Sequence, residues 1–194
     1  NVNKKWSDEL KKETCKLIEI CTEKSNISSV PKIWTEKFLN NKKNKNHLSG
    51  LKYVPLSSQL ENTKKKNSNI IKKVLITFGG NDHLNLSLMC IECLKKLFLN
   101  KIKIYLIVGD FYKNINLIKE AAKNSHHKIK ILKHLKGITN VLKKCNLSIN
   151  ASGTTMFELN IVGNLSLSFA VWKSQERILN LFKDNEKVQK IFCK

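Results

Sequence analysis

The sequence predicts an α/β fold with a doubly wound parallel sheet, and three observations support this prediction. From residue 69 to residue 184, short apolar runs alternate with stretches of helical periodicity. The runs are apolar in the way expected of strands that helices cover on both faces. The spacing between successive runs suits the right-handed crossovers that join parallel strands.

Five strands and five helices are expected in this region. The first apolar run is rich in Val, Ile and Leu and ends in a pair of glycines, and the third alternates apolar with basic residues. The strands are expected at 69–80, 101–109, 127–135, 146–152 and 165–171. Helices with period 3.6 are expected at 84–100, 111–124, 138–145, 154–163 and 175–184.

The N-terminal part differs in character. Residues 7–24 predict a helix, because Ser7 can cap it, Asp8 and Glu9 suit its first turn, and its apolar residues share a face. Residues 25–69 are rich in Lys and Asn and indicate loops or disordered linkers around a short ordered piece at 50–60. We therefore divide the chain into 1–49, a helix with a polar linker, and a domain at 50–194.

The chain is strongly basic, with a formal charge of +21 from 36 basic and 15 acidic residues. Only Arg177 is an arginine, whereas nucleic-acid readers favour the bidentate guanidinium. We therefore expect a lysine-coated, solvated surface and no nucleic-acid partner. No run approaches the ~20 apolar residues that span a bilayer. The first residues contain neither an initiator Met nor the apolar stretch of a secretory signal, which indicates a fragment.

Six cysteines are present, without the spacing of a disulfide framework or a zinc site. Cys90 and Cys93 form the only C-x-x-C pair. The pair lies about two turns inside a predicted helix, whereas redox pairs sit at helix N-termini. We expect packed core thiols and a reducing cytoplasm.

Three loops follow the carboxyl ends of predicted strands, where ligands gather in open parallel sheets. In the first, Gly79 and Gly80 precede Asn81 and Asp82. Two glycines let the backbone approach a ligand, and a following helix could offer free amides to a phosphate. The alternative is a tight turn in which Asn81 or Asp82 caps the helix.

The second loop contains Ser152, Gly153, Thr154 and Thr155. Its amides and hydroxyls could surround a diphosphate, and Glu158, one turn later, could accept hydrogen bonds from a ribose diol. The alternative is an ordinary capped helix with a solvated Glu158. In the third loop, after 165–171, Gln175 could bind a sugar or a base, or lie on the surface where a helix begins.

Taken in order, these loops resemble the nucleotide-binding C-terminal half of GT-B nucleotide-sugar enzymes. More narrowly, the chain is similar to the UDP-2,4-diacetamido-2,4,6-trideoxy-β-L-altropyranose hydrolases of pseudaminic acid biosynthesis, which are related to the N-acetylglucosaminyltransferase of peptidoglycan synthesis. The resemblance runs from about residue 50 to residue 175. It rests on the segments "GLKYVPL", "VLITFGGNDHLNL", "IYLIVGDFYKNI", "LKGITNVLKKCNLSINASGTTMFELNIVG" and "WKSQ", of which GTTMFEL is the most specific.

The resemblance implies a UDP-sugar ligand and a set of binding residues. Gly79, Gly80 and Asn81 would approach the diphosphate, and Glu158 would take the ribose. The backbone at His134 and Leu135 would read the uracil, and Gln175 would face the sugar. The residues that would hold the diphosphate oxygens are Ser152, Gly153, Thr154 and Thr155. No cofactor is implied, and no metal either, since no carboxylate pair lies at the expected phosphate site.

The resemblance also exposes departures. The family carries a Gly-x-Gly-His loop with a catalytic His in an N-terminal Rossmann domain, and this sequence has no such motif. Residues 1–49 would be a remnant of that domain. The N-terminal half of the enzyme would then be missing or a separate chain. No catalytic residue is therefore assigned. His83 is interpreted as a helix-start residue. The alternatives are a glycosyltransferase-like subunit that needs a partner chain and a degenerate, non-catalytic domain.

Overall fold

A computed structural model describes three short N-terminal strands together with residues 53–61, 63, 70–97 and 100–193. The chain divides into two compact units, Asn1–Pro55 and Leu56–Lys194. No helix among the described residues is long and apolar enough to cross a membrane.

The first unit contains a small parallel sheet of order β1-β2-β3, formed by β1 (Glu19–Cys21), β2 (Lys32–Trp34) and β3 (His47–Ser49). The helix expected over 7–24 is therefore wrong at Glu19–Cys21, and the linker expected after it contains two strands. Pairing between strands distant in sequence outweighs a weak local helical pattern. The other residues of that expected helix lie outside the described part of the chain.

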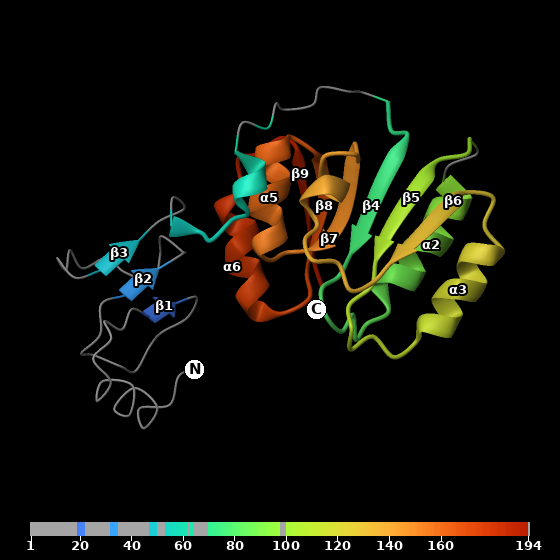
Figure 1. Cartoon of the computed structure of the whole chain (residues 1–194), viewed down its shortest axis with the longest axis horizontal. Coiled ribbons are helices and arrows are strands. Elements are labelled where there is room, and N and C mark those ends of the chain that lie inside the picture. Colours follow the sequence, from blue (N-terminus) through green and yellow to red (C-terminus); the bar gives the residue numbers. More distant parts are fainter. Residues whose placement is uncertain are drawn as a thin grey trace. The chain divides into compact units, whose positions relative to one another are not determined.

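The second unit is built on six parallel strands in the order β6-β5-β4-β7-β8-β9. The strands are β4 (Lys73–Thr77), β5 (Lys103–Ile107), β6 (Lys128–Leu132), β7 (Leu147–Ala151), β8 (Leu165–Ala170) and β9 (Val188–Phe192). The doubly wound fold class is thereby confirmed, and all five expected strands are present. The chain moves outward from β4 to β6, returns to β7 beside β4, and then continues in the opposite direction (Figure 1).

The sixth strand, β9, was not predicted. It pairs in parallel with β8, from Ser166 opposite Val188 to Ala170 opposite Phe192. It forms an edge of the sheet, so only one side of it needs a partner, and its sequence mixes polar with apolar residues. A short edge strand of this kind leaves little local signal.

Helices cover both faces of the sheet. They are α2 (Leu86–Leu97), α3 (Ile115–Lys123), α4 (Thr139–Leu142), α5 (Thr154–Val162) and α6 (Lys173–Leu181), with a 3-10 turn η3 at Ser58–Leu60. Figure 1 shows α2 and α3 on one side and α5 and α6 on the other. Alternate residues of β4 divide accordingly: Val74 and Ile76 join the core under α2 and α3, and Leu75 joins the core with Leu159 of α5.

A buried polar ladder joins β7 to β8 inside the sheet. The Asn150 Oδ1 atom accepts hydrogen bonds from the Ser166 and Ser168 hydroxyls, at 2.8 and 3.2 Å. All three side chains are buried, so a shift in register would leave polar groups without partners. This ladder fixes the ends of the two strands whose loops form the candidate site.

Candidate functional site

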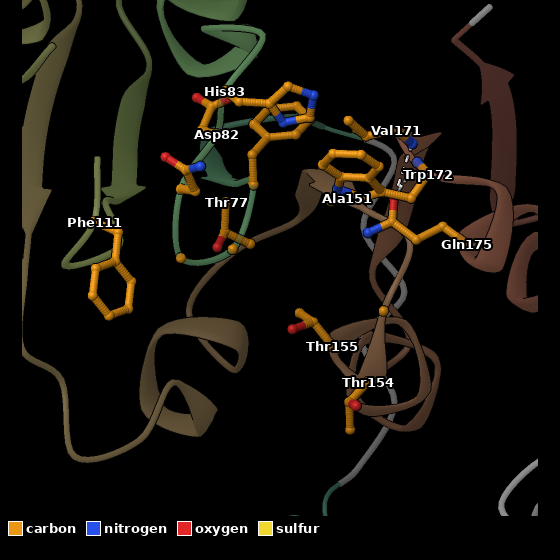
Figure 2. A pocket seen from close by; sticks show the side chains of 15 residues that line it. Thr77, Asp82, His83, Phe111, Ala151, Thr154, Thr155, Val171, Trp172 and Gln175 are labelled. Carbon is orange, nitrogen blue, oxygen red and sulfur yellow. Dashed lines mark hydrogen bonds between the residues drawn. The ribbon is translucent and has the colours of Figure 1, made fainter. Parts of the chain in front are cut away.

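A cavity of about 540 Å³ opens at the carboxyl ends of β4 and β7, where the strand order reverses. This is the place where doubly wound sheets bind ligands, and its volume is typical of small-molecule sites. It is lined by the loops after β4, β7 and β8 and by Phe111 from the loop after β5 (Figure 2).

The loop after β4 supplies its own helix cap. Asp82 accepts hydrogen bonds from the Leu86 amide at Oδ1 and from the Ser87 amide at Oδ2, both at 2.9 Å. Of the two caps that the sequence allowed, Asp82 is confirmed. Its carboxylate satisfies amides at the start of α2 and opposes the positive end of the helix dipole. The Leu86 and Ser87 amides are therefore occupied by the protein's own carboxylate and are not free for a phosphate.

A second glycine contact fixes this loop in place. Gly109, after β5, packs directly on the backbone of Gly80, and a Cβ atom at position 109 would lie 2.2 Å from the Gly80 carbonyl oxygen. That carbonyl also accepts a hydrogen bond from the Phe111 amide, at 3.1 Å. Only glycine fits this close approach of two main chains.

The start of α5 is different, because no side chain caps it. Gly153 occupies the cap position in an extended conformation, with φ −148° and ψ −158°, and no acidic residue lies in the first turn. Gly153, Thr154 and Thr155 all line the cavity. The positive end of the helix dipole therefore faces the cavity together with two hydroxyl groups, a combination suited to an anion.

Ser152 lies outside the cavity lining. Its side chain is fully buried, and its hydroxyl donates to the Gln175 carbonyl at 2.8 Å. Its amide donates to the Phe169 carbonyl, also at 2.8 Å. Ser152 thus ties the β7–α5 turn to the start of α6.

Glu158 lies one turn into α5 and is half-buried, but it does not line the cavity. Burial raises the pKa of its carboxyl group. No hydrogen bond or ion pair joins it to another residue in the described part of the chain. A partly desolvated carboxylate without a donor is a good acceptor for a ligand's hydroxyl groups.

The loop after β8 brings Trp172 and Gln175 to the cavity. The Gln175 Oε1 atom accepts hydrogen bonds from the Val171 and Trp172 amides, at 2.8 and 3.3 Å, and so caps α6. Because these donors identify the oxygen, the Nε2 amide group is the one that faces the cavity (Figure 2). The Trp172 ring stacks on His83, with centroids 4.4 Å apart and 29° between planes. His83 lies in the turn before α2 and not within the helix.

His134 and Leu135 follow β6, the edge strand on the far side of β5, and neither lines the cavity. His134 adopts a positive φ of 50°, and its Nδ1 atom lies 2.9 Å from the Asp110 Oδ1 atom. Both side chains of this pair are exposed, so the contact contributes little to stability.

The structure thus brings together most of the expected residues. Those that line the cavity are Gly79, Gly80, Asn81, Gly153, Thr154, Thr155 and Gln175. Ser152, Glu158, His134 and Leu135 do not. The sequence interpretation missed Thr77, Phe111 and Trp172 as cavity residues and assigned Asp82 and His83 no ligand-facing place. An aromatic residue directly after a predicted strand, such as Trp172, was the available signal.

Of the two cysteines in the C-x-x-C pair, only Cys90 packs in the core as expected. Cys90 is buried, and burial, with smaller contributions from Cys93 and Asp82, raises its pKa to about 12. Cys93 is exposed on the same helix, so the expectation that both thiols pack in the core is wrong. Positions three apart on a helix can straddle the edge of its buried face.

One solved structure with a similar fold is MurG from Acinetobacter baumannii. The TM-score is 0.57 and the sequence identity 15%, over 72% of this chain and 44% of the MurG chain. No family model and no curated protein sequence matches the chain. At this identity the likeness concerns the fold alone: the six-stranded sheet has the Rossmann-like architecture of a GT-B protein, and the chain spans less than half of the MurG chain.

Proposed function

We propose that the second unit binds the UDP moiety of a nucleotide sugar, with the diphosphate at the β7–α5 turn. The observation that carries this proposal is the uncapped start of α5, which opens onto the cavity beside Thr154 and Thr155. A helix start without a side-chain acceptor has free amides that can bind an anion, and the two threonine hydroxyl groups add further hydrogen-bond donors for it. Gly79, Gly80 and Asn81 would enclose the diphosphate from the opposite side.

The nucleoside would lie on the Glu158 side of the turn. The half-buried Glu158 carboxylate, which has no partner among the described residues, would accept hydrogen bonds from the ribose diol. The main chain near His134 and Leu135 would read the uracil edge. Ser152 would act indirectly, by holding the turn in place through its hydrogen bond to the Gln175 carbonyl.

We further propose that the chain is the nucleotide-binding half of a hydrolase that releases UDP from a diacetamido-trideoxy sugar. The resemblance of the loop sequences supports this substrate. Hydrolysis needs a general base to activate water and electrostatic stabilisation of the departing diphosphate. The cavity would supply the electrostatic stabilisation, and the base would come from the N-terminal half of a GT-B enzyme, on the same polypeptide or a separate one.

A second candidate is a glycosyltransferase-like subunit that acts only with a partner chain. The fold likeness to MurG, of which this chain spans 44%, favours it. If neither activity exists, the domain would be a degenerate, non-catalytic one. Transfer that appears only after addition of a partner polypeptide would distinguish the second candidate from the hydrolase.

Isothermal titration calorimetry of the 194-residue chain with UDP tests the binding site. We expect saturable binding, and we expect Gly153→Val to abolish it while leaving the melting temperature nearly unchanged. A Cβ at position 153 meets no atom within 4 Å, and the extended backbone accepts any residue, so the added side chain would fill only ligand space. Gly137 also has open space around it and lies outside the cavity, so Gly137→Val is a matched control. Undiminished UDP affinity in Gly153→Val, or no binding to the parent chain at millimolar UDP, would refute the proposal.

A further inference from the structure

We propose that Trp172 is a specificity-determining residue that stacks its indole on the apolar face of the sugar ring. This inference rests on the proposed function, because it assumes a diphosphate at the start of α5. It assigns a task to an aromatic side chain that neither the core nor the helix caps require.

The first support is the exposure of Trp172. Its side chain is 58% exposed, although tryptophan usually buries most of its large apolar surface. The exposed indole faces a cavity whose lining includes glycine, threonine and phenylalanine residues. In Figure 2 it extends from the β8–α6 loop between His83 and the end of the cavity where Thr154 and Thr155 lie. A ligand bound there would cover apolar surface that now meets water.

The second support is that the indole is held in place. His83 from the β4–α2 loop stacks on one face of it, at 4.4 Å between ring centroids. The Trp172 amide donates to the Gln175 Oε1 atom, which fixes the main chain at the start of α6. A ring that is already oriented loses little conformational freedom when a ligand stacks on its free face.

The third support concerns which part of the ligand reaches Trp172. Glu158, the proposed ribose acceptor, lies on α5 outside the cavity lining, whereas Trp172 and Gln175 lie inside it. A diphosphate at the α5 start would therefore direct the nucleoside toward Glu158 and the sugar into the cavity. There the sugar would meet an aromatic face from Trp172 and an amide donor from the Gln175 Nε2 atom. A pyranose has both an apolar C–H face and hydroxyl or acetamido acceptors, so it matches this pair of groups.

The experiment compares two ligands on the full chain: UDP, which lacks the sugar, and UDP-N-acetylglucosamine as the sugar-bearing probe. We expect Trp172→Ala to weaken binding of the sugar nucleotide roughly tenfold and to change UDP affinity less than about twofold. Trp172→Phe should retain most of the affinity. Leu97→Ala, which truncates an exposed apolar side chain outside the cavity, is the control for loss of surface area.

A direct readout of contact comes from tryptophan fluorescence. The chain has three tryptophans, so the other two are replaced by phenylalanine to leave Trp172 as the reporter. The sugar nucleotide should change the emission of Trp172 more than UDP does. Equal loss of both affinities in Trp172→Ala, or unchanged affinity for the sugar nucleotide, would overturn the inference while UDP binding by the parent chain still upheld the proposed function. Absence of UDP binding by the parent chain would remove both.

Discussion

Two loops at the reversal point of the sheet contain glycine and begin a helix, yet they treat the helix start in opposite ways. After β4, Asp82 places its carboxylate on the Leu86 and Ser87 amides, so the protein itself supplies the anion. After β7, the cap position is Gly153, and the nearest acid, Glu158, comes one turn too late to serve. Because a helix start stabilises negative charge, the start of α2 is already satisfied by Asp82. The start of α5 has no side-chain acceptor and suits the proposed diphosphate.

The glycines of the two loops also differ in the space around them. The β4–α2 loop is fixed by the main-chain contact between Gly80 and Gly109, where a Cβ would meet a carbonyl oxygen at 2.2 Å. At Gly153 the same added atom meets nothing within 4 Å. Packing thus requires a glycine at position 109, whereas the space beside Gly153 is open, as the proposed diphosphate site needs.

The largest expected effect on stability comes from adding a side chain at Gly109, where the two main chains are in contact. Gly109→Ala should lower the free energy of unfolding by roughly 2–4 kcal/mol, because two main chains must separate to admit the methyl group. Thermal melts should show a decrease of roughly 5–15 °C. Gly137→Ala, in open space, is the control. Equal stability of the two variants would show that the β4–α2 loop is not held by this contact.

A smaller loss of stability should follow from removing the Asp82 cap, which would leave the start of α2 uncapped like that of α5. Asp82→Ala removes the cap of α2 and should cost about 1–2 kcal/mol of unfolding free energy, measured by chemical denaturation. The same change removes a negative charge from the cavity lining. We therefore expect UDP affinity to rise by a few-fold, the reverse of what loss of stability alone would suggest. A marked fall in UDP affinity would mean that Asp82 itself serves the ligand.

The smallest effect on stability is expected at Glu158, where the direction of the change is informative. Burial raises the pKa of this carboxyl in the folded state, so its ionisation opposes folding: that penalty appears as the pH rises through the ordinary carboxyl pKa and is complete above the raised value. Glu158→Gln should therefore be slightly more stable than the parent chain at pH 7, and the advantage should disappear in acid below the ordinary carboxyl pKa.

Binding should respond in the opposite sense at the same position. UDP affinity of Glu158→Gln should fall by roughly tenfold, because the ribose diol loses a charged acceptor. The pair of measurements separates two roles, since a purely structural Glu158 would change the melting temperature and leave the calorimetric affinity alone. An unchanged affinity would place the ribose elsewhere.

The sequence by itself determined the sheet class and five of its six strands, because apolar runs and helical periodicity are local signals. It also placed small and hydroxyl residues after the strands, and these now line the cavity at Gly79, Thr154 and Thr155. It predicted a helix where the strand Glu19–Cys21 lies, and it missed β9, since both strands depend on pairing with other segments of the chain.

Only the tertiary structure decided which helix start is free. The residues around Asp82 and Gly153 allow either loop to be capped or open, and the partners of the side chains decide it. Asp82 accepts from amides of α2, whereas the Ser152 hydroxyl donates to the Gln175 carbonyl and does not cap α5. The same holds for the Trp172–His83 stack, whose members are 89 positions apart (172 − 83) and meet because β4 and β8 flank β7. Local sequence specifies the groups, and strand order brings them together at one edge of the sheet.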